Sequence, residues 1–116
     1  MSPMSVNVNL ETARQALRGL WARQSVISDN IANINTPGYR TKHLDFDAYM
    51  AQASNEGATL PTEHIQSDGR KRMRSDQNSV DLEGEMIHLM QNALQYRSLL
   101  SQVNRKMDMY HSIVRR

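Results

Sequence analysis

Residues 86–114 read MIHLMQNALQYRSLLSQVNRKMDMYHSIV and carry apolar side chains at nine successive positions that are three or four residues apart. Such steps keep side chains on one side of an α-helix, which has about 3.6 residues per turn. Asp81, Glu83 and Glu85 would then place negative charge in the first turn, where the helix dipole favours it. The pattern predicts a helix over residues 81–114 whose seam is formed by Met86, Leu89, Ala93, Tyr96, Leu100, Val103, Met107, Tyr110 and Val114.

A second stripe of the same kind lies near the N-terminus, with Gln24 as its only polar member. Asn9 is expected to cap this helix, and Pro37 to end it, because the residue before a proline disfavours the helical conformation. Gly19 is a weak point, since glycine costs up to about 1 kcal/mol relative to alanine inside a helix. The prediction is a helix over residues 9–35 with a seam of Leu10, Ala13, Leu17, Leu20, Ile27, Ile31 and Ile34.

The segment between the helices, residues 36–78, follows neither stripe. Pro37 and Gly38 fit the central positions of a type II turn. Asp45 is expected to cap a short helix near residues 45–53, whose apolar face would consist of Phe46, Tyr49, Met50 and Ala53. The rest of the segment is expected to be largely irregular.

The two seams determine the expected architecture, because an isolated amphipathic helix is only marginally stable in water. They can close on each other as an antiparallel hairpin, on copies of the same chain, or on both. The expected fold is all-α, with residues 1–116 forming a single domain. In it, two long heptad-patterned helices pair as a coiled-coil hairpin joined by a long middle segment.

Composition and motifs argue against several functions. The net charge is only +2, and the longest apolar run, residues 48–51, is far short of the roughly 20 residues that cross a bilayer. The N-terminus does not resemble a cleavable secretion signal, and the chain has no cysteine. The four histidines are widely separated, and no phosphate-binding loop or nucleophile motif occurs. We therefore expect no catalytic residue, no metal, no cofactor and no small-molecule substrate.

One basic run leaves an alternative open. Residues 70–74 read RKRMR, which is the best candidate in the chain for binding nucleic acid. On this reading the protein is a helical-hairpin binding module or a dimeric regulator. The even charge balance along the rest of the chain makes nucleic acid the less favoured partner.

Residues 28–40, SDNIANINTPGYR, closely resemble the N-terminal signature of bacterial flagellar rod and hook axial proteins. Three further pieces fit the short proximal subunits of the flagellar basal-body rod: LDF at residues 44–46, NSVDLE at 78–83 and LQY at 94–96. The matching signature positions are Asn30, Ile31, Ala32, Asn33, Asn35, Thr36, Pro37, Gly38 and Tyr39.

The resemblance implies a structural subunit and no enzymatic activity. It implies self-assembly with other rod proteins into the periplasm-crossing drive shaft, whose wall encloses the export channel. The implied partners are copies of the chain, other rod proteins, membrane-ring and rod-base adaptor proteins, and the flagellar type III export apparatus. The implied location is the periplasmic rod of the basal body, reached without a cleavable signal peptide.

Overall fold

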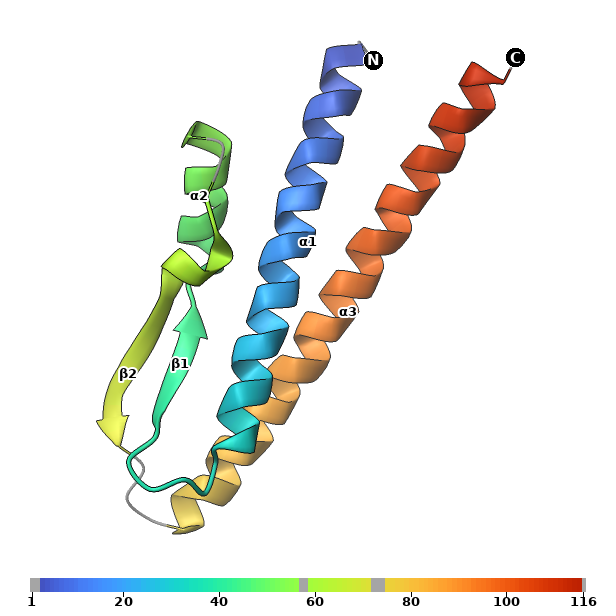
Figure 1. Cartoon of the computed structure of the whole chain (residues 1–116). Helices are drawn as coiled ribbons and strands as arrows, with labels where there is room; N and C mark the ends of the chain where they lie inside the picture. Colours follow the sequence, from blue (N-terminus) through green and yellow to red (C-terminus); the bar gives the residue numbers. More distant parts are fainter. Residues whose placement is uncertain (1–2, 57–58, 72–74, 116) are drawn as a thin grey trace.

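Two long antiparallel helices form the body of the molecule, with both chain ends at the same end of the pair (Figure 1). The computed structural model describes residues 3–56, 59–71 and 75–115, with side chains described over 10–55, 59–67 and 81–115. A small two-stranded sheet and a short helix lie against one flank of α1. In chain order the elements are α1 (Pro3–Ala32), β1 (Arg40–Leu44), α2 (Phe46–Glu56), the 3-10 helix η1 (Pro61–His64), β2 (Ile65–Lys71) and α3 (Ser75–Val114).

Both long helices begin earlier than the sequence pattern predicted. α1 starts at Pro3, so Asn9 lies inside the helix and is not its cap. Proline suits this first position, because it has no N–H to leave unpaired. α3 starts at Ser75, which removes Asp81 from the first turn. The apolar stripe marks only the part of a helix that packs, and residues outside the stripe extend the same helix beyond it.

The middle segment is more regular than expected. β1 and β2 pair as antiparallel strands, with Lys42 opposite Ser67 and Leu44 opposite Ile65. The expectation of a largely irregular segment was therefore wrong for these residues. Neither strand shows the alternation of apolar and polar residues that identifies a strand in a sequence.

The predicted short helix is confirmed, and it packs closely on α1. Asp45 caps α2 by accepting a hydrogen bond from the Ala48 N–H at 3.1 Å. The Tyr49 side chain is fully buried, and its hydroxyl donates to the main-chain carbonyl of Gln15 at 3.0 Å. Burial raises the pKa of the Tyr49 phenol above its ordinary value, and the nearby Arg18 opposes this shift.

The contact between α1 and α3 is tightest toward the end that carries the turn after α1 (Figure 1). Leu20 and Ile27 of the predicted seam are buried there, together with Val26. Toward the chain ends the two helices diverge. The predicted pairing of the long helices is confirmed, but a single chain does not close its seam over the full length.

Gly19 is the residue that lets α2 approach α1. A Cβ at this position would lie 2.8 Å from Cε2 of Phe46 and 2.8 Å from Cε2 of Tyr49. We expect Gly19→Ala to lower the free energy of unfolding by about 1–3 kcal/mol, since overpacking displaces both rings. Urea denaturation of the purified chain measures this change.

Gly84 provides the matched control, because nothing lies within 4 Å of a Cβ built there. Gly84→Ala should be neutral or stabilising by up to about 1 kcal/mol through helix propensity. Equal effects at the two glycines would contradict the packing role of Gly19.

Candidate assembly site

The signature residues after α1 form a tight turn. The Tyr39 N–H donates to the Thr36 carbonyl at 3.2 Å, and Gly38 has φ of 78°. This positive φ at the third residue is the mark of a type II turn, so the prediction at Pro37 and Gly38 is confirmed. Asn33 stabilises the end of α1, because its Nδ2 donates to the Asp29 carbonyl at 2.9 Å. The turn reverses the chain and returns β1 alongside α1.

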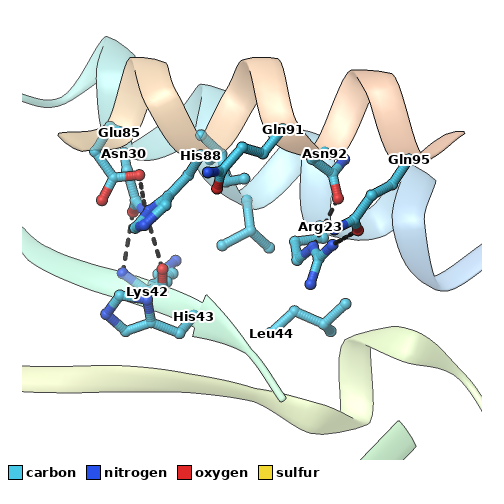
Figure 2. Close-up of a pocket in the computed structure, with 12 residues that line it drawn as sticks. Arg23, Asn30, Lys42, His43, Leu44, Glu85, His88, Gln91, Asn92 and Gln95 are labelled. Carbon is cyan, nitrogen blue, oxygen red and sulfur yellow. Dashed lines mark hydrogen bonds between the residues drawn. The ribbon is translucent and has the colours of Figure 1, made fainter. Parts of the chain in front are cut away.

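Asn30 connects three parts of the fold through one buried side chain, which is only 1% exposed. Its Nδ2 donates to the Lys42 carbonyl at 2.8 Å, and its Oδ1 accepts from the Lys42 N–H at 3.0 Å. The Tyr39 hydroxyl also donates to Oδ1, at 3.0 Å. The side-chain amide therefore binds β1 as the main chain of a neighbouring strand would (Figure 2).

Asn30 also faces α3. Its Nδ2 lies 3.4 Å from Oε2 of Glu85, a buried carboxylate. Both residues line a cavity of about 240 Å³ between α1, α3 and β1. Lys42, His43 and His88 line the same cavity (Figure 2).

A second polar connection joins α1 to α3 next to the apolar core. Nδ2 of Asn92 donates to the Leu20 carbonyl at 2.9 Å and to Oε1 of Gln24 at 2.7 Å. Arg23 donates from Nε to Oδ1 of Asn92 at 2.6 Å and from Nη2 to Oε1 of Gln95 at 2.6 Å. Gln24, the polar exception in the N-terminal stripe, thus has a partner across the helix pair.

Arg23 contacts α2 as well as α3. Its guanidinium carbon lies 5.1 Å from the centre of the Phe46 ring, in cation–π geometry with α2. Burial lowers the pKa of Arg23 from its ordinary value, and Asp47 opposes the shift. The Arg23 side chain therefore connects α2 to the hydrogen bonds between α1 and α3.

The structure places the predicted seam residues in three environments. Leu20 and Ile27 are buried, whereas Leu10, Ala13, Leu17 and Ile31 on α1 are half-buried. Ile34 is also half-buried, but it lies in the turn after α1, because the helix ends at Ala32 and not at residue 35 as predicted. On α3 the half-buried members are Leu89, Ala93, Tyr96 and Val103. The exposed members, all on α3, are Met86, Leu100, Met107, Tyr110 and Val114.

Further apolar side chains are exposed outside the seam. Trp21 and Met90 are each 65% exposed, and Ile87 and Leu94 are also exposed. The Trp21 ring lies 6.0 Å from that of Tyr96, which places it beside α3. Exposed apolar side chains that gather on neighbouring helices are typical of a surface that another protein covers.

Sequence reasoning did not identify Asn30, Asn92, Arg23 or Glu85 as contacts between the helices. One signal was present, because Asn92 lies between Leu89 and Tyr96 on the same face of the predicted helix. A polar residue inside an apolar stripe needs a partner when it is buried. The side chains of residues 68–80, including the basic run at 70–74, lie outside those that the structure describes.

Long helices that expose several apolar side chains are typical of proteins that pack against other proteins. Within the described ranges, no group of histidine and acidic residues could hold a metal ion. None of the described helices has the length and hydropathy needed to cross a membrane.

Comparisons with known proteins identify the family. The model of the flagella basal body rod protein family matches residues 10–40. The chain is 27% identical to flagellar basal body rod protein FlgB of Bacillus subtilis (strain 168), over 90% of this chain and 92% of that protein. It is 30% identical to FlgB of Cereibacter sphaeroides over 81% of this chain and 84% of that protein, and 28% identical to FlgB of Escherichia coli (strain K12) over 79% and 82%. The chain belongs to the FlgB family of flagellar basal body rod proteins, which is structural and not enzymatic.

Proposed function

We propose that this protein builds the proximal part of the flagellar rod by packing its exposed helical seam against copies of itself and against other rod proteins. The assembled rod would cross the periplasm as the drive shaft and enclose the export channel. The proposed further partners are the membrane-ring and rod-base adaptor proteins. The proposed route to the rod is the flagellar type III export apparatus, without a cleavable signal peptide.

The observation that supports this proposal best is the exposed half of the α3 seam. Leu89, Ala93 and Tyr96 of the stripe are half-buried nearer the turn. Leu100, Met107 and Tyr110 continue the stripe toward the C-terminus, and they are exposed in the single chain. Fully burying an apolar side chain of this size contributes about 1.5–3 kcal/mol, so covering the 37–49% of these side chains that is exposed contributes about 1 kcal/mol each. Apolar helices of neighbouring subunits would supply that burial in a rod.

Two parts of the surface of the helix pair differ in what covers them. One flank holds the hairpin and α2 through the polar contacts of Asn30 and Arg23. The exposed Trp21, Met86 and Met90 lie on the two helices themselves. Methionine side chains adapt to surfaces of different shape, which suits a subunit that meets more than one kind of neighbour.

Deletion of the gene tests the proposed function. A flagellated source strain that lacks this chain should lose motility, and the intact chain should restore it. Mass spectrometry of detergent-extracted basal bodies should find the chain with the other rod proteins. Full motility of the deletion strain, together with absence of the chain from intact basal bodies, would refute the rod function.

A further inference from the structure

α3 carries a second group of exposed apolar side chains that does not belong to the predicted seam. Ile87, Met90 and Leu94 are 54%, 65% and 64% exposed. They follow one another at steps of three and four residues, so they share one face of the helix. Each stands one position after a stripe residue, which turns it about 100° away from the stripe. We refer to these three side chains as the second patch.

The outer seam of α3, formed by Leu100, Met107 and Tyr110, lies further toward the C-terminus and is also exposed. Met90 and Met107 are roughly 25 Å apart along the helix, at 1.5 Å per residue. The outer seam and the second patch therefore occupy different faces and different heights of α3. A copy of the chain can contact one neighbour through each of them at the same time.

The charges near the two apolar groups have opposite signs. Asp81 and Glu83 are exposed just before the second patch, and residues 81–96 contain no lysine or arginine. Residues 97–116 contain one acidic residue, Asp108, and their exposed basic side chains include Arg97, Arg105, Lys106 and Arg115. Two outer seams brought together would repel each other, whereas an outer seam and a second patch attract each other.

We propose that the outer seam of one copy packs on the second patch of the next copy, with the two α3 helices parallel and displaced by about 25 Å. A contact between two different surfaces of the same chain leaves one of each surface unused at the ends, so it repeats. Because the displacement runs along the helices, the repeated contact cannot close into a ring and gives an open helical assembly. The inference rests on the proposed function, because it names what covers the seam in the rod.

Introduced cysteines report this contact without background, because the chain has none of its own. Met90→Cys and Met107→Cys in the same chain should give a ladder of dimers, trimers and longer species when assembled basal bodies are oxidised with copper phenanthroline. The two sites of one chain are too far apart for a disulfide, which needs Cβ atoms roughly 3.5–4.5 Å apart, so each bond must join two copies. Either variant alone should stay monomeric.

Three outcomes of this experiment would overturn the contact. Dimers of the Met107→Cys variant alone would show that outer seams pack on each other. Cross-links from Met90→Cys to a different rod protein alone would show that another partner covers the second patch. The absence of a ladder in basal bodies that contain the double variant would show that the two surfaces do not meet.

Met109 provides a matched control for Met107. It is also an exposed methionine, and it lies at nearly the same height of α3, but two positions turn it about 200° around the helix. Met90→Cys combined with Met109→Cys should therefore give no ladder. A ladder of equal strength would show that the cross-links do not depend on the helix face, which contradicts the proposed packing.

A second cysteine pair tests the direction of the helices. If the helices are parallel, Leu94 of one copy lies near Tyr110 of the next. If they are antiparallel, it lies near Val103. We expect a ladder from Leu94→Cys with Tyr110→Cys and none from Leu94→Cys with Val103→Cys. The reverse result would overturn the parallel arrangement.

Met90→Asp tests the second patch without a cross-link. Met90 is largely exposed, so the single chain should stay folded, whereas the carboxylate would be buried in the contact. We expect incorporation into basal bodies to fall at least about tenfold, which corresponds to about 1.4 kcal/mol of lost contact energy. Gln102→Asp is the control, because it adds the same charge to an exposed polar position of α3 outside both apolar groups.

The deletion strain separates failure of this inference from failure of the proposed function. Normal incorporation of Met90→Asp, in a strain that the deletion renders non-motile, would overturn the contact between copies and leave the rod function standing. A motile deletion strain would instead refute the rod function itself.

Discussion

Asn30→Ala is expected to lower the free energy of unfolding by about 3 kcal/mol or more. The substitution removes both hydrogen bonds to the main chain of Lys42, and it leaves the Tyr39 hydroxyl without this acceptor. Each buried polar group left without a partner costs about 1–3 kcal/mol. Urea denaturation measures the loss of stability, and amide exchange should show that the Lys42 N–H is no longer protected.

Asn33→Ala is the control for this experiment, because it removes an asparagine three residues away on the same helix end. Asn33 bonds the Asp29 carbonyl and accepts from the Thr36 hydroxyl, and neither bond reaches β1. We expect this variant to lose about 1 kcal/mol and to keep the Lys42 amide protected. Equal losses in both variants would show that Asn30 acts only as a helix-end residue.

The features that could be predicted from the sequence depend on residues that lie close together in the chain. The type II turn at Pro37 and Gly38 follows from two residues, and the cap of α2 follows from Asp45 and the residues after it. The long helices follow from a periodicity that repeats every turn. The helix starts were missed because the stripe does not mark the helical turns that lie beyond it.

The features that could not be predicted join residues far apart in the chain. β1 pairs with β2 across more than 20 residues, and Asn92 on α3 contacts Leu20 and Gln24 on α1, which are far from it in the sequence. These contacts are polar, so they leave no apolar pattern in the sequence. Two asparagines of the signature illustrate this: Asn33 bonds a main-chain carbonyl at the end of α1, whereas Asn30 binds a strand.

Gly19 in α1 is another residue whose role depends on contacts that are distant in the sequence. Helix propensity identifies Gly19 as a weak point, but only the approach of Phe46 and Tyr49 shows why a larger side chain does not fit. The periodicity of the seam likewise predicts which side chains require burial, but it does not predict which molecule buries them. In the single chain, Leu100, Met107 and Tyr110, which form the outer seam of α3, stay exposed and are free to pack against another subunit.

Leu100→Asp is expected to leave the single chain folded and to abolish its assembly. Leu100 is 37% exposed in the single chain, so a carboxylate there keeps access to water. We expect the free energy of unfolding to fall by only about 1 kcal/mol. In a rod the same side chain would lie among apolar residues, where an unpaired charge costs several kcal/mol. Circular dichroism of the purified variant and its incorporation into basal bodies measure the two effects separately.

Ser101→Asp adds the same charge one residue further along α3, at an exposed polar position outside the seam. This variant should fold and should support motility, because its carboxylate points away from the stripe that contains Leu100. If Leu100→Asp enters basal bodies as well as Ser101→Asp does, the outer seam is not the assembly surface. If Leu100→Asp fails to fold, the seam is already closed within one chain, since only a buried carboxylate would unfold it.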